Sequence, residues 1–347
     1  MKKLLLAMCL CMAVVMVVSP AFALNGDDFH ARGIGVGYAS GATAPPGLYF
    51  IDENWFLPSV VAHSGSQANP NVKLFVYLNV PIMIWVPGCK FLGADYSMAL
   101  AEPILYQNIR VKTGGTTTTS GLPLTTSPTW VSGEVWGTYN TEWANDLSWK
   151  LPCNFFVKTG LAIGFDDAWS TDRNSIASIN IPGIGKVSGG LNNAISKTDG
   201  GVYAWTGQAD WQIVPTLGIS WLYQGWNVSA GLGYVFYTKD TATDYQSADQ
   251  FFGDYTISYT CGKWTLGLIG ESTAQVGKDK ANFGTGYQSQ DGTQAENYGI
   301  GPLIGYNFGP CSVNFWYEFA FDTRNQAGGD WFGFRIIVPL GNPCPLR

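Results

Sequence analysis

Several segments of the chain alternate between apolar and mixed positions over long stretches. In the longest, from Val72 to Val86, every even-numbered position is aliphatic, whereas the odd-numbered positions include Lys73, Tyr77 and Trp85. In an extended strand the two sets of side chains point to opposite faces. The aliphatic face is as long as the roughly 9 to 11 residues with which a tilted strand crosses a bilayer. The pattern predicts a membrane-spanning strand whose even-numbered face meets lipid.

The last two alternating segments have a similar length. Val313–Phe321 places its odd-numbered residues, mostly aromatic, on one face, and Phe332–Leu340 does the same with its even-numbered apolar residues. A soluble β-sandwich also has alternating strands, but these are commonly about five or six residues long and need a polar exterior. An apolar outside with a polar inside is typical of an outer-membrane barrel.

Two kinds of connection alternate between the predicted strands. Outer-membrane barrels have short turns in the periplasm and long loops outside, so each kind is assigned a side. The short connections are residues 87–90, 151–154, 224–226, 261–263 and 309–311, and the long polar ones are residues 58–71, 111–129, 166–199, 239–248, 274–294 and 323–330. This arrangement predicts an even number of strands, with both termini in the periplasm.

We therefore predict an all-β fold, a transmembrane antiparallel β-barrel of the Gram-negative outer-membrane type with about 12 strands. Residues 24–347 form it as a single domain. Residues 29–39 also alternate and are an alternative edge strand, which leaves a neighbouring strand number open. The predicted strands are residues 48–57, 72–87, 91–107, 130–150, 154–165, 201–223, 227–238, 249–261, 263–273, 295–308, 312–322 and 331–340.

Composition excludes two other classes of protein. Charged residues make up 13% of the 347 residues, against about 25% in soluble domains. From residue 24 onward no apolar run reaches the roughly 18 to 20 residues of a spanning helix, which excludes a helical membrane bundle. Disorder is excluded because the chain has 14 Trp, 17 Tyr and 19 Phe, whose burial strongly favours folding.

Residues 1–23 have the features of a cleaved secretory signal peptide. Lys2 and Lys3 are followed by the apolar stretch Leu4–Val18 and by the small-residue cleavage signal Ala21–Ala23. Cleavage removes two cations and no anion, so the net charge changes from −6 to −8. Nucleic acid is therefore not expected as a partner. We expect a monomer in the outer membrane, surrounded by outer-membrane lipid and lipopolysaccharide.

Assigning the aliphatic faces to lipid leaves polar and aromatic side chains for the lumen. The predicted lumen-lining residues are Lys73, Tyr77, Trp85, Asp95, Lys158, Asp254, Trp316, Glu318 and Arg335. The bore at this strand number is narrow, so the aromatic rings either form a slot for flat apolar solutes or only fill the interior. Glu318 and Arg335 fall at similar depth in the last hairpin, which predicts a salt bridge across it.

Five cysteines follow the signal peptide, each in or beside a predicted short turn or after the last strand. The periplasm is oxidising, so disulfides can form there. Cys311 and Cys344 are the favoured pair because both lie at the rim of the last two strands, and Cys89 with Cys153 is the second choice. Unpaired turn cysteines are the alternative.

No catalytic residue, cofactor or metal site is predicted. His30 lies near the mature N-terminus and His63 in a predicted outer loop, so neither is on the lipid face of a strand beside a plausible serine nucleophile. The cysteines are too far apart to form a metal site. An outer-membrane lipid-modifying enzyme is therefore the less favoured alternative.

Short motifs in a fixed order resemble the outer-membrane family of meta-pathway phenol-degradation proteins. They are Pro45–Tyr49, Thr243–Phe251, Trp264–Gly270 followed by Gln275 and Asp279, Gly299–Tyr306 and Ile337–Leu340, with Ala248 where the family pattern has glycine. The resemblance covers nearly the whole mature chain. It implies a barrel that passes small hydrophobic or aromatic compounds and offers no catalytic residues to carry over. A structural or surface-recognition barrel without transport is the alternative.

Overall fold

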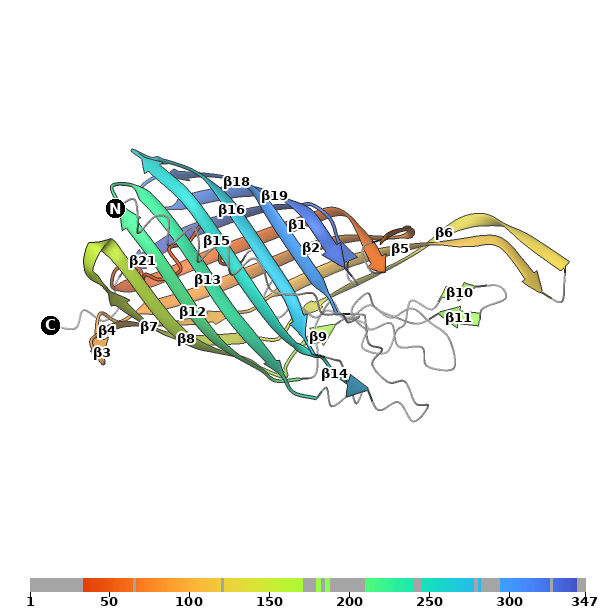
Figure 1. The fold of residues 1–347 in the computed structure, drawn as a ribbon, viewed down its shortest axis with the longest axis horizontal. Coiled ribbons are helices and arrows are strands. Elements are labelled where there is room, and N and C mark those ends of the chain that lie inside the picture. Colours follow the sequence, from red (N-terminus) through yellow and green to blue (C-terminus); the bar gives the residue numbers. More distant parts are fainter. Residues whose placement is uncertain are drawn as a thin grey trace.

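The computed structural model describes residues 34–64, 67–119, 122–170, 179–181, 185–187, 210–239, 245–277, 280–281, 294–324 and 327–341. Their strands form a closed antiparallel β-barrel of 12 strands, seen from the side in Figure 1. The last strand, β21 (Trp331–Gly341), pairs with the first, β1 (Gly47–Ser64), along Leu48–Phe56. The predicted fold class is confirmed.

Most wall strands follow one another in sequence order around the barrel. Three of the twelve wall strands are each interrupted once. The third consists of β4 and β5, the fourth of β6 and β7, and the fifth of β8 and β9. The other wall strands between β1 and β21 are β2 (Gln67–Val86), β4 (Ala94–Ala101), β5 (Ile104–Thr119), β6 (Leu122–Thr138), β7 (Glu142–Lys150), β8 (Phe155–Gly164), β9 (Trp169–Ser170), β12 (Gln212–Tyr223), β13 (Trp226–Tyr237), β15 (Asp249–Cys261), β16 (Trp264–Val276), β18 (Glu296–Asn307) and β19 (Ser312–Arg324).

Short elements accompany the wall. They are β3 (Lys90–Phe91), the 3₁₀ turn η1 (Pro152–Asn154), β10 (Ile179–Ile181), β11 (Gly185–Val187), β14 (Tyr245–Gln246), β17 (Lys280–Ala281) and β20 (Ala327–Gly328). Among the residues that the structure describes, no helix is long and apolar enough to cross a membrane.

The two ends of the barrel differ as the connections predicted. At the short-turn end, tight turns join β7 to β8, β12 to β13, β15 to β16 and β18 to β19, and β1 begins and β21 ends there. Gly225 (φ 88°) and Gly262 (φ 62°) give two of these turns a left-handed backbone, which glycine adopts at little steric penalty. The opposite end is called the long-hairpin end.

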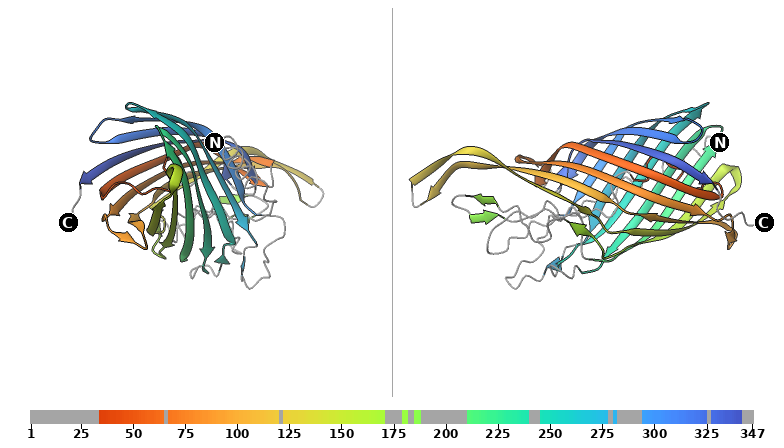
Figure 2. Two further views of the ribbon diagram at one scale, coloured as in Figure 1. Left: turned by 60° about the vertical axis from the view of Figure 1, so that its left-hand side comes forward. Right: turned by 180° about the vertical axis from the view of Figure 1, so that it is seen from behind.

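Two predicted loops at the long-hairpin end are strands instead. Residues 58–71 lie largely within β1 and β2, and residues 111–129 continue the ladder of β5 and β6 as far as the pair Thr119 and Leu122. The β5–β6 hairpin projects well beyond the barrel (Figures 1 and 2). The polar composition of these segments suggested loops, but threonine favours an extended backbone. Beyond the barrel wall, β5 and β6 satisfy each other's backbone hydrogen-bonding groups.

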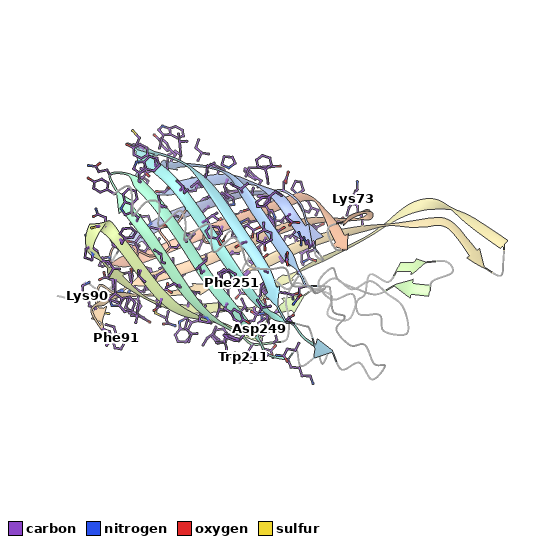
Figure 3. The ribbon with its side chains drawn as sticks, in the orientation of Figure 1. Lys73, Lys90, Phe91, Trp211, Asp249 and Phe251 are labelled. Carbon is purple, nitrogen blue, oxygen red and sulfur yellow. The ribbon has the colours of Figure 1, made fainter. Side chains whose placement is uncertain are left out.

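The outward surface carries a band of large apolar side chains between two groups of aromatic ones. Figure 3 shows one member of each aromatic group, Phe91 and Trp211, at opposite ends of the barrel. At the long-hairpin end the exposed aromatic residues include Trp136, Trp211, Phe236 and Phe321; at the short-turn end they include Phe91, Trp226, Trp264 and Phe308; and Leu217, Ile219, Leu266, Leu268 and Ile300 lie between. An apolar band with aromatic girdles at both borders is the exterior of a membrane barrel.

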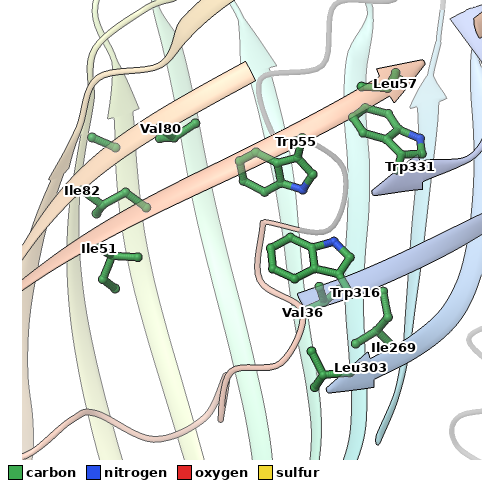
Figure 4. Close-up of a cluster of buried hydrophobic side chains, with 11 residues drawn as sticks. Val36, Ile51, Trp55, Leu57, Val80, Ile82, Ile269, Leu303, Trp316 and Trp331 are labelled. Atoms are coloured by element: carbon green, nitrogen blue, oxygen red, sulfur yellow. The ribbon is translucent and has the colours of Figure 1, made fainter. Parts of the chain in front are cut away.

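The interior holds a packed apolar cluster (Figure 4). Trp55 of β1 and Trp316 of β19 meet edge to face with ring centroids 5.9 Å apart. The buried members of this lumen core are Val36, Ile51, Trp55, Leu57, Val80, Ile82, Ala101, Ile269, Leu303, Trp316 and Trp331. The barrel therefore has a hydrophobic core inside as well as an apolar exterior.

Replacing a tryptophan inside and one outside tests this double arrangement. Trp55 is fully buried, so Trp55→Ala leaves a cavity and should lower the free energy of unfolding by about 3 to 5 kcal/mol. Trp264 is 52% exposed on the outward face, so Trp264→Ala should lower the free energy of unfolding much less. Urea unfolding of the protein in lipid vesicles measures both, and equal losses would contradict an interior core.

Candidate functional site

Residues 34–46, which precede β1, are called the lumen segment. Residues 34–43 lie inside the barrel, and residues 44–46 are exposed where β1 begins. The predicted edge strand at residues 29–39 is therefore wrong where the structure describes it, because residues 34–37 form turns in the lumen. Wall side chains on several strands hydrogen-bond the segment. These contacts are Gly35 N to Asp254 Oδ2 (2.7 Å), Gly37 N to Thr256 Oγ1 (2.8 Å), Gly41 N to Ser220 Oγ (2.7 Å), Asn227 Nδ2 to Tyr38 O (3.1 Å) and Ser148 Oγ to Gly41 O (2.7 Å).

Arg335 of β21 holds one side of the lumen segment. Its Nη1 and Nη2 donate to the carbonyl oxygens of Val36 and Ile34, each at 2.7 Å, and its Nε donates to Glu53 Oε1 of β1. Tyr38 also donates to Glu53 Oε1, at 2.8 Å. Both charged side chains are fully buried, so the pair is stabilised by geometry and by these additional hydrogen bonds.

Two aromatic rings enclose the Arg335 guanidinium. Its central carbon lies 3.6 Å from the ring centroid of Tyr38 and 5.1 Å from that of Trp316. A cation over an aromatic face is attracted electrostatically, and more strongly when it is desolvated. Arg335 thus joins the lumen segment, the lumen core and the wall in one contact network.

On its other side the lumen segment lies against the wall without room for side chains. A Cβ on Gly218 of β12 would overlap the carbonyl oxygen of Ser40, and a Cβ on Gly41 would overlap the backbone at Phe156 and Ser220. Glycine at these positions permits the close approach. With Arg335 on the β21 side, the segment spans the interior from one wall to another.

Polar side chains line the wall around the segment. Lys158 Nζ lies 3.3 Å from Asp146 Oδ2, and Asn297 donates to Glu271 and accepts from Thr323 Oγ1 at 2.6 Å. Within the described residues, no three or more His, Cys, Asp or Glu are grouped so that they could hold a metal ion. The arrangement suits passage or binding of a solute.

Six of the predicted lumen residues lie on the inward face. Asp254, Trp316, Glu318 and Arg335 are almost completely buried in the interior, and Lys158 pairs with Asp146 there. Asp95 lies on the inward side of the register, opposite Ser148, but at the exposed rim, where it pairs with Lys90 at 2.7 Å.

The other three, Lys73, Tyr77 and Trp85, lie on the outward face of β2, so their assignment was wrong. The register pairs Val80 with Glu53 and Ile82 with Ile51, which puts the aliphatic face of β2 in the lumen core. Alternation separates two faces but does not say which is inside. Here the lumen itself is apolar, so the aliphatic face is buried inward.

The predicted Glu318–Arg335 salt bridge is also wrong. Arg335 lies opposite Asn314, while Glu318 lies opposite Trp331, so the two are four positions out of register in the last hairpin. That offset is roughly 13 Å along a strand. Arg335 instead pairs with Glu53 across the β1–β21 seam, directly opposite in the register.

Sequence reasoning missed Glu53, Tyr38 and the lumen segment. In β1 both alternating faces are mixed, since Glu53 and Trp55 on one face are matched by Asp52 and Asn54 on the other. The only available signal was the three alternating glycines Gly33, Gly35 and Gly37, whose lack of side chains suits close packing against a wall.

Four of the predicted turn cysteines, Cys89, Cys153, Cys261 and Cys311, carry free thiols, so the second-choice pair of Cys89 with Cys153 is not formed. Cys344 lies outside the described residues, but Cys311 carries a free thiol, so the favoured pair of Cys311 with Cys344 is not formed either. His30 also lies outside the described residues. His63, expected in a loop, belongs to β1 opposite Ala68.

Comparison with known proteins agrees with this architecture. The family described as "Putative MetA-pathway of phenol degradation" matches residues 187–336, which confirms the resemblance found in the sequence for that part of the chain. No curated protein sequence matches the chain.

A solved outer membrane channel has the same fold. An outer membrane channel from Pseudomonas putida F1 is similar with a TM-score of 0.59 and 11% sequence identity, covering 87% of this chain and 98% of that one. The toluene transporter TodX of Pseudomonas putida has a TM-score of 0.38 at 9% identity (92% and 98% covered), and a Pseudomonas aeruginosa FadL homologue has 0.39 at 10% identity (92% and 99% covered). The likeness to the Pseudomonas putida F1 channel shows that this chain has the fold of an outer-membrane β-barrel.

Breaking the buried pair should destabilise the barrel more than breaking an exposed one. Arg335→Met leaves the Glu53 carboxylate buried without its cation, and the free energy of unfolding should fall by about 3 to 5 kcal/mol. Arg324→Met, which removes a cation 35% exposed beside Asp322, should cost less than about 1 kcal/mol. The double variant Glu53→Gln/Arg335→Met should be more stable than Arg335→Met alone in urea unfolding. A double variant no more stable would refute the pairing.

Displacing the lumen segment should open the lumen. Gly218→Val places a side chain where the Ser40 carbonyl lies, so we expect a severalfold rise in single-channel conductance in planar bilayers. Gly270→Val is the matched control, because Gly270 alternates with the inward residues Ile269 and Glu271 and meets no atom closer than 3.4 Å. Equal conductance of the two variants would show that the segment does not restrict the lumen.

Proposed function

From the family match over residues 187–336 and the likeness to an outer membrane channel, we propose that this protein passes small hydrophobic or aromatic compounds across the outer membrane through its lumen. The observation that carries the proposal is the apolar surface inside the barrel. Porins that pass hydrophilic solutes have a polar, water-filled interior, whereas Trp55, Trp316 and Leu303 are buried together in this lumen.

The lumen combines two surfaces that an aromatic solute with a polar group requires. Where the lumen segment moves aside, the lumen core would offer apolar and aromatic contacts, and the polar wall around Lys158 and Asp254 would offer hydrogen-bonding groups. Ligand sites for small molecules are commonly mostly apolar with a few placed polar groups. In this proposal the lumen segment narrows the path, and a passing solute moves along it or shifts it.

The proposal includes the setting in the membrane. Residues 1–23 act as a cleaved signal peptide, and residues 24–347 form one monomeric barrel surrounded by outer-membrane lipid and lipopolysaccharide. The short-turn end and both termini face the periplasm, because short turns are periplasmic in outer-membrane barrels. The protein has no enzymatic role here.

A role in surface recognition is the second candidate, and the β5–β6 hairpin favours it. This hairpin continues as a two-stranded ladder to Thr119 and Leu122, far from the barrel body (Figure 2). Under this alternative the barrel is an anchor for the hairpin, and solute passage is absent.

Transport is tested with two tryptophans on opposite sides of the same wall. Trp316 is buried in the lumen and Trp85 lies on the outward face. If the lumen is the path, liposomes with the wild-type protein admit phenol-type solutes faster than empty ones, Trp316→Ala changes the rate severalfold, and Trp85→Ala leaves it unchanged. Uptake by protein-containing liposomes no faster than by empty ones would end the channel proposal and favour recognition.

A further inference from the structure

The side chain of Tyr38 reaches from the lumen segment to the inward face of the seam between β1 and β21. Its ring packs on the lumen core and lies over the guanidinium of Arg335, whose central carbon is 3.6 Å from the ring centroid. Its hydroxyl donates to Glu53 Oε1 at 2.8 Å, and Arg335 Nε donates to the same oxygen. Charged wall residues thus contact both the face and the hydroxyl of this one ring.

The groups that hold the Tyr38 ring belong to the barrel wall. Glu53 lies on β1, Arg335 on β21 and Trp316 on β19, and all three side chains are buried. Trp316, in the lumen core (Figure 4), has its ring centroid 5.1 Å from the central carbon of the guanidinium. Glu53 and Arg335 are directly opposed in the register. The strand pairing of the wall therefore positions this acid and this cation, and the lumen segment supplies the ring.

The chemistry of these groups selects for a phenol. Beyond its Cβ, tyrosine is a phenol ring, so a free phenol presents the same aromatic face and the same hydroxyl. The guanidinium attracts the face of the ring, and the carboxylate accepts a charge-assisted hydrogen bond from the hydroxyl. An aromatic hydrocarbon offers only the ring face. An aromatic carboxylate brings a second negative charge to Glu53, which is unfavourable where water is excluded.

We propose that Glu53, Arg335 and Trp316 form a binding site for phenols, and that Tyr38 occupies it as an internal ligand of the same chemistry. A phenol that enters the lumen replaces the Tyr38 side chain. Its ring lies on the guanidinium of Arg335, and its hydroxyl donates to Glu53. This inference rests on the proposed function, because it names the class of solute that the same lumen takes.

Only the side chain of Tyr38 needs to move when a phenol binds. It is partly exposed, and the backbone before it is held separately, by the hydrogen bonds of Arg335 to the carbonyls of Ile34 and Val36. A phenol therefore competes with one hydrogen bond and one ring contact of the lumen segment. A buried ion pair is stable only while its hydrogen-bonding groups are satisfied. The internal ligand meets this condition when no solute is present.

The test removes the internal ligand and supplies the same ring from solution. Tyr38→Ala leaves the space of the ring beside Glu53 and Arg335, and p-cresol is the tyrosine side chain as a free molecule. An apolar cavity of this kind binds a ring that matches it. Isothermal titration calorimetry of the full mature protein in detergent should show p-cresol binding to Tyr38→Ala at least about tenfold more tightly than to the wild-type protein, in which Tyr38 competes.

Two analogues of p-cresol test the selectivity of the site. Toluene has the ring without the hydroxyl, and p-toluate has a carboxylate in its place. Tyr38→Ala should bind each of them at least about tenfold more weakly than p-cresol, because a site built to accept a hydrogen bond from a hydroxyl discriminates against ligands that lack it.

Tyr96→Ala is the matched control. Tyr96 also donates a hydrogen bond, to Asn145 Oδ1 at 2.6 Å, but it lies on the outward face of β4, since its neighbour Ser97 is buried inward. Tyr96→Ala should bind p-cresol no more tightly than the wild-type protein does, which accounts for p-cresol dissolved in the detergent. Heat-modifiable migration on a gel checks that each variant is folded.

If Tyr38→Ala does not fold, Tyr38→Phe decides. It keeps the ring and loses only the hydrogen bond to Glu53, so p-cresol displaces it more easily. We expect p-cresol to bind Tyr38→Phe at least about threefold more tightly than the wild-type protein. Unchanged affinity in this variant contradicts the site.

Three results with folded Tyr38→Ala overturn the proposal. The first is p-cresol affinity equal to that of the wild-type protein, which shows that Tyr38 fills no phenol site. The second is toluene binding as tightly as p-cresol, because the hydroxyl then contributes nothing. The third is an equal gain of affinity in Tyr96→Ala, because p-cresol then binds wherever a tyrosine is removed.

Failure of this inference is distinguishable from failure of the proposed function. Passage is measured as uptake of phenol-type solutes by liposomes with the wild-type protein, whereas the site is measured as binding in detergent. Faster uptake without a gain of p-cresol affinity in Tyr38→Ala refutes the site and leaves transport standing. A gain of p-cresol affinity without uptake supports the site and refutes transport.

Discussion

Closure of the sheet between β1 and β21 is the constraint on which the rest of the structure depends. Backbone groups within a membrane have no water to bind, so an open sheet edge is not tolerated and the last strand must pair with the first. Glu53 and Arg335 are directly opposed on this closing seam, and both point inward. The remaining donors of Arg335 bind the carbonyls of Ile34 and Val36. One side chain thus connects the seam to the segment that occupies the lumen.

The buried ion pair determines position more than it adds stability. Removing two charges from water is unfavourable, and a buried pair offsets this only when its remaining hydrogen-bonding groups are satisfied. Arg335 meets that condition through two carbonyls and the rings of Tyr38 and Trp316. An apolar pair in its place would leave those carbonyls without their donors. Arginine at this position therefore holds the irregular backbone of the lumen segment inside the barrel, where the segment forms no strand pairing of its own.

The sequence was informative where a local pattern determines the structure. It was uninformative where the structure depends on what fills the lumen. The turns around Gly225 and Gly262 and the bounds of β15 follow from local chemistry and alternation, and were predicted closely. The inward direction of the Val80 side chain could not be predicted. It depends on the lumen segment, which is far from Val80 in the sequence and packs into the same cluster. The salt bridge failed for a similar reason, since counting residues from a loop does not give the register between strands.

The outward face of β1 and β2 shows how polar residues can lie opposite lipid. Asp52 accepts from Asn79 Nδ2 at 2.7 Å and from Asn54 Nδ2 at 3.1 Å, and Tyr77 donates to Asn54 Oδ1 at 2.7 Å. A polar group in hydrocarbon is unfavourable mainly when it lacks a partner, and these side chains satisfy one another.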